Sequence, residues 1–281
     1  ELMPDIGFLN GRFMPLGETM VPVEDRGYQF GDGVYEVIRT YHGRPFQLDA
    51  HLARLERSAR AIELPMPFQT HEWQGYVAEG IRRGGYPESK VYIQLTRGVA
   101  PRAHLFPVAV RPTAVMTVRE MQPLDSTLRA AGVGAITVED LRWGRCDIKS
   151  VNLLPNVMGR QRAKESGAFE AIFVRGGEVT EGAVSNVMLV RGRVLITAPE
   201  GTRILSGVTR AIVLGLARKE GVSVQERAVG LDELHGADEI FLTGTTVEVL
   251  PVVRLDGAVV GTGKPGELTG LLSARFRSSL G

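Results

Sequence analysis

The chain has 281 residues, a formal net charge of +1 and 43% hydrophobic residues, which is typical of an ordinary soluble globular protein. The length predicts about two domains of typical size. The near-neutral charge and the lack of a dense basic run argue against a nucleic-acid or membrane-surface partner.

Cysteine content and hydropathy narrow the expected compartment. The single cysteine, Cys146, excludes a disulfide within the chain, which fits a reducing environment. No apolar stretch approaches the roughly 20 residues that a spanning helix needs. Residues 1–12 lack the basic-then-apolar pattern of a signal peptide. We therefore expect a cytoplasmic protein without a membrane segment.

Two hairpins are predicted near the N-terminus. In residues 6–16, Asn10-Gly11 stands between two apolar runs, which is a strong short-range signal for a type I′ turn. Residues 34–48 predict a second hairpin, which turns at His42-Gly43. Antiparallel pairing should therefore be prominent in the first half of the chain.

Helices and strands should follow these hairpins. Apolar residues recur at helical spacing in residues 48–62, where Asp49 is a plausible N-cap. A second helix over residues 71–84 should end at Gly84-Gly85. The expected strands that follow are residues 90–98 and 107–118.

Residues 121–133 lack a clean period and are interpreted as a linker. They would join an N-terminal domain, residues 1–120, to a C-terminal domain, residues 134–281. The second domain should contain helices over residues 154–167, 205–221 and 266–280, a strand near 132–139, hairpins over 169–182 and 185–196, and strands over 223–229 and 238–255. The class is therefore mixed α and β in two domains.

Several common catalytic motifs are incomplete. Residues 261–266 fit the G-x-G-x-x-G spacing, but Pro265 lies inside the motif and too little chain follows for a βαβ unit. Residues 71–75 lack the second histidine of a zinc-protease helix, and there is no G-x-S-x-G elbow. The five histidines and one cysteine show no metal-ligand spacing. Hydride transfer, serine hydrolysis and zinc chemistry are disfavoured, and no metal is expected.

Lys149 suggests a different chemistry. It stands among apolar and small polar residues in CDIKSVNLLPNV, residues 146–157. Most lysines are solvated, but a lysine can also form a Schiff base with a carbonyl such as that of pyridoxal phosphate. That cofactor needs a phosphate cradle, and helix starts and strand ends rich in N–H groups can supply one. Two segments are candidates for this cradle: Gly207 with Thr209, and Gly244 with Thr245 and Thr246. Taken alone, clusters of this kind are usually ordinary turns and helix caps.

Three separated blocks, in this order and spacing, resemble the class IV pyridoxal-phosphate-dependent aminotransferases of fold type IV. The blocks are residues 31–59, 147–157 and 178–190, and the resemblance runs from about Gly7 to about Val249. It implies a smaller N-terminal α/β domain and a larger C-terminal domain built on a β-barrel-like sheet. It also implies pyridoxal 5′-phosphate as cofactor, bound at the domain interface.

The resemblance implies roles for the matching positions. Lys149 matches the lysine that forms the Schiff base and shuttles the proton, and Glu181 matches the acid that bonds the pyridine nitrogen. Arg54 matches the phosphate-binding arginine. Outside the resemblance, Glu181 would be a turn acid and Arg54 part of a solvated helix face. The other predicted cofactor positions are Ser185, Asn186, Leu205, Gly207, Val208, Thr209, Gly244, Thr245 and Thr246.

The substrate class depends on residues 101–104, PRAH. Arg102 and His104 resemble the carboxylate trap of D-amino acid aminotransferases, because an arginine fork can hold a carboxylate bidentately. Tyr35 could add a third donor. The resemblance implies that this loop reaches the active site of the neighbouring subunit, so catalysis would need a homodimer. The same residues would also suit an ordinary exposed loop.

The expected reaction is transamination between a D-amino acid, such as D-alanine, and a 2-oxo acid, such as 2-oxoglutarate, in two half-reactions. Two alternatives share Lys149 and Glu181: an aminodeoxychorismate lyase and an L-branched-chain aminotransferase of the same fold. A third alternative is a catalytically silent relative that only binds. The expected partners are small amino and oxo acids.

Overall fold

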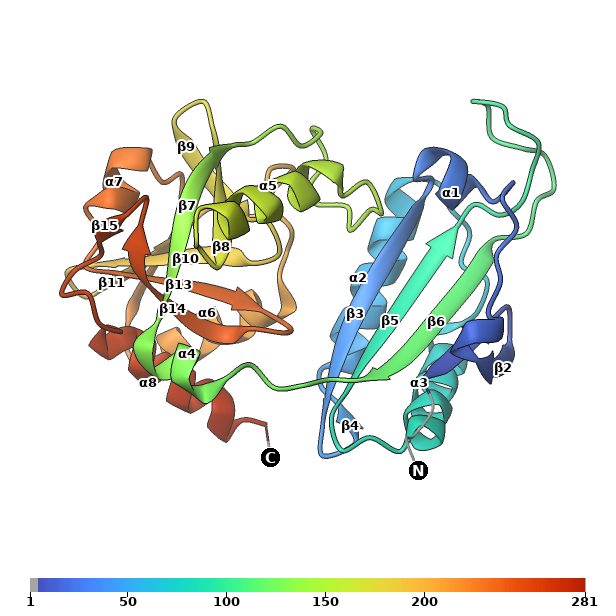
Figure 1. Ribbon diagram of the computed structural model, residues 1–281, viewed down its shortest axis with the longest axis horizontal. Coiled ribbons are helices and arrows are strands. Elements are labelled where there is room, and N and C mark those ends of the chain that lie inside the picture. The colour runs from blue at the N-terminus through green and yellow to red at the C-terminus, as the bar shows by residue number, and fades with distance from the viewer. Residues whose placement is uncertain (1–4, 281) are drawn as a thin grey trace. The chain divides into compact units, whose positions relative to one another are not determined.

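The computed structural model describes residues 5–280, and these residues form two compact units (Figure 1). The first unit contains the described residues up to Pro123 together with Ile148–Asn152. The second unit contains Leu124–Asp147 and the described residues from Leu153 onward. The segment around Lys149 therefore belongs with the first unit, although the sequence assigned it to the second domain. The limits predicted for the two domains remain a prediction.

The first unit is built on an antiparallel six-stranded sheet. In spatial order its strands are β2 (Arg12–Pro15), β1 (Ile6–Leu9), β6 (Thr113–Glu120), β5 (Ser89–Thr96), β3 (Gly33–Tyr41) and β4 (Arg44–Pro45). Both predicted hairpins are confirmed. Asn10 and Gly11 have φ values of 49° and 93°, and His42 and Gly43 have values of 52° and 73°, as a type I′ turn requires.

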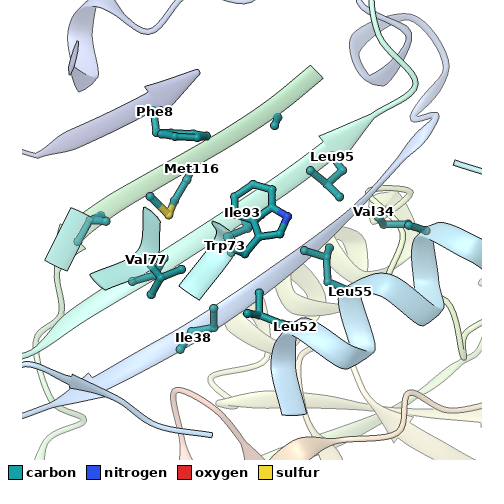
Figure 2. Packing of buried hydrophobic residues seen from close by; sticks show 14 of the residues in the cluster. Phe8, Val34, Ile38, Leu52, Leu55, Trp73, Val77, Ile93, Leu95 and Met116 are labelled. Atoms are coloured by element: carbon teal, nitrogen blue, oxygen red, sulfur yellow. The ribbon is translucent and has the colours of Figure 1, made fainter. Parts of the chain in front are cut away.

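Two helices, α2 (Leu48–Ala61) and α3 (Thr70–Gly84), supply apolar side chains to the core of this sheet (Figure 2). Leu55 and Trp73 from the helices and Phe8 from β1 are fully buried there. The predicted N-cap Asp49 is wrong, because Gln47 occupies that position with φ 54°. Asp49 lies in the first turn of α2, where a carboxylate still favours the helix dipole.

Short elements complete the first unit. The 3-10 helix η1 (Leu16–Glu18) and helix α1 (Arg26–Phe30) were not predicted, because both are too short to show a period. The Asp25 side chain caps α1 by accepting a 2.8 Å hydrogen bond from the Gly27 N–H. The strand predicted over residues 107–118 is wrong at its start, since β6 begins only at Thr113.

The second unit is built on a mixed nine-stranded sheet that curls into a half-barrel (Figure 1). Three of its pairings, β7 with β8, β7 with β14 and β11 with β12, are parallel. The strand order is β12 (Ser223–Glu226), β11 (Val194–Thr197), β10 (Asn186–Arg191), β13 (Glu239–Gly244), β14 (Glu248–Leu255), β7 (Val133–Glu139), β8 (Glu170–Arg175) and β9 (Glu178–Gly182), with β15 (Ala258–Val259) paired to β14.

The helices of the second unit are α4 (Ser126–Ala131), α5 (Leu154–Glu165), α6 (Val208–Lys219), α7 (Leu231–His235) and α8 (Glu267–Ser278). The predictions of α5, α6 and α8 are confirmed. Helix α4 lies inside the predicted linker and was missed because six residues are too few for a periodic signal. A core that includes Leu189, Leu234, Leu242 and Leu250 is almost wholly buried. Within residues 5–280, no helix has the length and apolar character needed to cross a membrane.

Candidate active site

Lys149 lies on a short segment that runs beside the start of β3. Its carbonyl accepts a hydrogen bond from the Tyr35 N–H at 2.9 Å, and its own N–H donates to Ser58 Oγ at 3.1 Å. Its Nζ lies 4.3 Å from the centroid of the Tyr35 ring, a cation–π arrangement. The main chain is therefore fixed on both sides, while the half-buried side chain lies against an aromatic face.

Tyr35 belongs to an aromatic pair on neighbouring strands. Its ring centroid is 5.6 Å from that of Tyr92, which lies on the adjacent strand β5. Burial, together with the neighbouring Tyr35, raises the pKa of Tyr92 to about 12, so this phenol stays neutral at any ordinary pH. The predicted residues Lys149 and Tyr35 are thus brought together within the first unit, and Tyr92 was not anticipated.

Arg54 belongs to a buried charge cluster rather than to a solvated helix face. Its Nε donates to Glu36 Oε1 at 2.6 Å and its Nη2 donates to Glu36 Oε2 at 3.0 Å. His51 Nδ1 lies 2.8 Å from the same Oε2. Glu36 is fully buried and the other two side chains nearly so. This bidentate pair holds the guanidinium of Arg54, which extends from α2, against Glu36 of β3.

The protonation of this cluster follows from its geometry. Burial alone would raise the pKa of Glu36, but the charge of Arg54 and hydrogen bonds from His51 and Arg54 lower it to about 2. Burial lowers the pKa of His51, in spite of the hydrogen bond to Glu36 that acts in the opposite direction. His51 is therefore neutral at pH 7, with its Nδ1 proton directed at the ionised Glu36.

Arg102 and His104 lie together against the end of α1. The Arg102 guanidinium lies 4.5 Å from the centroid of the Phe30 ring and donates to the Gln29 carbonyl at 3.0 Å. The His104 ring lies 5.5 Å from the same phenyl ring. Both side chains are exposed. The PRAH loop thus presents its cationic and imidazole groups on the surface of the first unit.

A buried ion cluster anchors the PRAH loop. Asp32 Oδ2 accepts hydrogen bonds of 2.8 Å from the Nε atoms of both Arg26 and Arg97. Arg26 also donates to the Ala103 carbonyl at 2.6 Å, and Arg97 stacks 3.6 Å from the Phe106 ring centroid. These anchors come from two separate stretches of sequence, residues 26–32 and Arg97, which directly follows β5. They were not predicted, because no local sequence pattern joins them.

In the second unit, Glu181 is the acceptor for three different segments. Its Oε1 accepts a hydrogen bond from Arg142, and its Oε2 accepts from Asn186 Nδ2 and from the Leu205 N–H, each at 3.0 Å. The carboxylate is buried at the end of β9. The predicted residues Glu181, Asn186 and Leu205 therefore converge. This arrangement suits a fixed anion more than a turn acid.

Arg142, which was not predicted as a site residue, neutralises this buried carboxylate. Its Nε and Nη2 donate to the two oxygens of Asp140, both at 2.9 Å, and its guanidinium lies 4.7 Å from the Phe173 ring centroid. Burial alone would lower the pKa of Arg142, but the hydrogen bonds to Asp140 and the charge of Glu181 raise it. Arg142 thus stays charged between two acids and holds Glu181 in place.

Ser185 lies on the turn between β9 and β10 and faces a second buried acid. Its Oγ donates to Glu170 Oε2 at 2.9 Å, while the Ala171 N–H donates to Glu170 Oε1 at 3.0 Å. Burial raises the pKa of Glu170 in spite of these hydrogen bonds. Glu170 therefore fixes the turn that carries Ser185.

The start of α6 is the first of the two segments predicted to bind the cofactor phosphate. Gly207 is its N-cap and makes no side-chain capping bond. A Cβ at Gly207 would lie 2.0 Å from Asn186 Oδ1, so only glycine permits this close approach. The first backbone N–H groups of a helix have no partner within the helix and favour an anion. Val208 and Thr209, the first two helical residues, contribute such groups.

The other predicted phosphate segment is the hairpin between β13 and β14. Gly244 pairs with Glu248 across a turn that contains Thr245 and Thr246. A Cβ at Gly244 would lie 3.5 Å from the Val184 carbonyl, so this hairpin lies beside the turn that carries Ser185. Within residues 5–280, no group of three or more histidine, cysteine or acidic side chains is placed to hold a metal ion.

Comparison with known proteins defines the class of this chain. Residues 33–255 match the family model described as amino-transferase class IV. The chain therefore belongs to the class IV aminotransferases, and the prediction of this family is confirmed.

Three relatives with similar sequences are D-alanine aminotransferases. The chain is 46% identical to the D-alanine aminotransferase of Bacillus licheniformis, over 96% of this chain and 95% of the relative. It is 40% identical to the D-alanine aminotransferase of Listeria innocua, over 95% and 93% of the two chains. A Staphylococcus haemolyticus D-alanine aminotransferase is 41% identical over 96% and 95%.

Solved structures share the fold at lower identity. The branched-chain amino acid aminotransferase of Escherichia coli superposes with a TM-score of 0.92 at 25% identity, covering 98% of this chain and 94% of the other. The T.th. branched-chain amino acid aminotransferase with pyridoxamine 5′-phosphate has a TM-score of 0.92 at 26% identity, covering 100% and 95%. These matches confirm the predicted fold, with a smaller antiparallel sheet and a larger curled one.

Proposed function

We propose that this chain transfers the amino group of a D-amino acid, such as D-alanine, to a 2-oxo acid, such as 2-oxoglutarate, with pyridoxal 5′-phosphate as cofactor. The observation that carries this proposal is the 46% identity to a D-alanine aminotransferase over 96% of the chain. Branched-chain enzymes that share the fold are only 25–28% identical. The sequence relatives therefore favour D-amino acids over L-branched-chain substrates.

The donor set fits pyridoxal phosphate. The uncapped start of α6, with Val208 and Thr209, suits a phosphate, and Thr245 and Thr246 would add hydroxyl groups. Glu181 would bond the protonated ring nitrogen, and the cation of Arg142 holds that carboxylate ready. A similar protein, the T.th. branched-chain enzyme, has been solved with pyridoxamine 5′-phosphate. When bound, the cofactor would supply an electron sink for negative charge at the substrate Cα.

Residues of the first unit also have proposed roles. Lys149 Nζ would take the proton from Cα of the amino acid in one half-reaction and would supply a proton to Cα of the oxo acid in the other, since a positioned amine is an effective general acid and base. Because the main chain of Lys149 is held by two hydrogen bonds, the positions that its Nζ can reach are restricted, which favours a productive orientation. Arg54 is proposed as a phosphate ligand, held in orientation by Glu36.

We place Arg102 and His104 in the active site of a second copy of the chain, so that the functional unit is a homodimer. Large apolar side chains are exposed in two stretches of the same unit, residues 20–28 and residues 105–108, which supports a partner surface. The exposed fractions are 74% for Met20, 74% for Val23, 81% for Tyr28, 83% for Leu105 and 94% for Val108. The expected compartment remains the cytoplasm, given the single cysteine.

Arg102→Ala should raise KM for D-alanine by about 10-fold to 100-fold, because a charge-assisted hydrogen bond to the substrate carboxylate is lost. Binding of pyridoxal phosphate should not change. Steady-state kinetics and cofactor titration measure the two effects. Arg111→Ala removes an exposed arginine that follows the same loop and serves as the matched control. Equal kinetics for the two variants would remove Arg102 from the carboxylate trap.

Glu181→Gln should lower turnover by about 10² to 10³, a typical loss when a preorganised electrostatic group is removed. The amide keeps the size of the side chain and can still accept from the Leu205 N–H, but it carries no charge for the ring nitrogen. Turnover and pyridoxal phosphate affinity are the readouts. Glu178→Gln, on the same strand but half-exposed, is the control. Similar losses in both variants would argue against a specific role.

A substrate panel tests the proposed function. The purified holoenzyme is mixed with D-alanine or L-leucine, with and without 2-oxoglutarate. We expect pyruvate from D-alanine only when the acceptor is present, beyond a single turnover, and little turnover of L-leucine. Clear turnover of L-leucine without reaction of D-alanine would assign the chain to the branched-chain enzymes. Release of pyruvate from aminodeoxychorismate without any acceptor would identify the lyase alternative.

A further inference from the structure

Glu248 has an unusual backbone conformation for its residue type. It is the first residue of β14, and its φ of 59° lies in the left-handed region. Only 4% of the whole residue is exposed. A left-handed residue at the end of a three-residue hairpin turn is common, but glycine normally occupies it. A side chain in this region is strained and persists only where the surroundings enforce it.

Arg129 supplies that enforcement. Its Nη1 lies 2.8 Å from Glu248 Oε2, and the exposed fractions of the two side chains are 12% and 5%. The same Nη1 donates to the Val247 carbonyl at 3.3 Å. Arg129 therefore holds both the side chain of Glu248 and the backbone of the preceding residue. It lies in the last turn of α4, which begins the second unit.

The pair lies directly beside the proposed phosphate ligands. Gly244 and Glu248 face each other across the turn, and Thr245, Thr246 and Val247 form its tip. A change of φ at Glu248 reorients the peptide units of this tip and with them the hydroxyl and N–H donors. The strained backbone conformation of Glu248 therefore sets the direction in which those donors point.

We propose that Arg129 and Glu248 are positioning residues that fix the 244–248 hairpin in its phosphate-binding conformation. This inference rests on the proposed function, because it takes Thr245 and Thr246 as ligands of the cofactor phosphate. Neither Arg129 nor Glu248 needs to touch the cofactor. Removal of Arg129 leaves a buried carboxylate without its ion-pair partner, which strongly favours a rearranged hairpin.

The test compares two forms of the cofactor that differ only in the phosphate. Apoprotein of the wild type, Arg129→Met and Glu248→Gln is titrated with pyridoxal 5′-phosphate and with pyridoxal, and binding is followed by absorbance. We expect both variants to lose about tenfold in affinity for the phosphorylated form, the value of one weakened charge-assisted bond. Affinity for pyridoxal should change by less than about twofold, since pyridoxal makes no such bond. Glu248→Gln leaves no buried carboxylate unpaired and keeps the test valid if Arg129→Met folds poorly.

A matched control separates this effect from general loss of stability. Arg227→Met breaks an ion pair of the same unit, with Glu233, and should leave both affinities unchanged. The proposal is overturned if the wild type binds both ligands and the Arg129 and Glu248 variants bind them equally well. It is also overturned if both ligands lose affinity by the same factor. A wild type that binds neither ligand would instead refute the proposed function on which the inference depends.

Discussion

Lys149→Ala is expected to lower transamination by at least about 10⁴-fold while leaving the fold intact. The substitution removes both the nucleophile and the proton carrier, and positioned proton transfer alone contributes about 10² to 10⁴. The contacts that hold the segment are made by the main chain of Lys149, to Tyr35 and Ser58, and alanine preserves them. The loss should therefore be chemical and not structural.

Turnover, absorbance and melting temperature together test this prediction. The wild-type holoenzyme should show a Schiff-base band near ~420 nm that the variant lacks, whereas the two melting curves of the apoproteins should coincide. Lys164→Ala removes an exposed lysine from α5 and is the control. If Lys149→Ala retained turnover within about tenfold of the control, Lys149 could not be the catalytic lysine.

Glu36→Ala is expected to destabilise the first unit by about 3–5 kcal/mol, the usual cost of breaking a buried ion pair. The substitution leaves the buried Arg54 guanidinium without its bidentate carboxylate and His51 without its acceptor. Thermal and urea unfolding measure the effect. Glu79→Gln, which touches two largely exposed arginines on α3, is the control and should have little effect.

The same cluster predicts how stability depends on pH. Folding lowers the pKa of Glu36 from 4.5 to about 2, so its contribution is present above pH 4.5 and disappears as the pH falls toward 2. That shift corresponds to about 3 kcal/mol for this fully buried group. Folding also lowers the pKa of His51 below 6.5, so stability falls further as the pH drops below that value.

Unfolding of the wild type and of Glu36→Ala is followed from about pH 7 to about pH 2, the range over which these groups titrate. Between pH 4.5 and pH 2 the stability of the variant should decline less steeply than that of the wild type, because the variant lacks the group that titrates. Parallel curves for the two proteins would show that Glu36 is not held ionised by Arg54 and His51.

Elements with strong local signals were predictable from sequence. The Asn10-Gly11 turn and the periodic helices α2 and α3 follow from residue preferences within a few positions. Helices α1 and α4 were missed because five or six residues show no period, and tertiary contacts decide whether they form.

The candidate site was predictable only in part. Lys149 and Glu181 stand in recognisable blocks, but their surroundings depend on pairs formed across the fold. Arg54 on α2 pairs with Glu36 on β3, and Glu181 pairs with Arg142, which lies 39 residues earlier in the sequence. No periodicity or motif reports such pairs, because they arise from the packing of strands and turns. The buried acids and arginines around the site therefore needed the structure.

One half-reaction tests the central claim most directly. Purified holoenzyme is mixed with D-alanine in the absence of any 2-oxo acid, and pyruvate and the absorbance near ~420 nm are followed. We predict about one pyruvate per subunit, loss of the band, and its recovery when 2-oxoglutarate is added, since each subunit can take up only one amino group until an acceptor is supplied. Continuous release of pyruvate without an acceptor, or no response to D-alanine while L-leucine bleaches the band, would contradict the assignment as a D-amino acid aminotransferase.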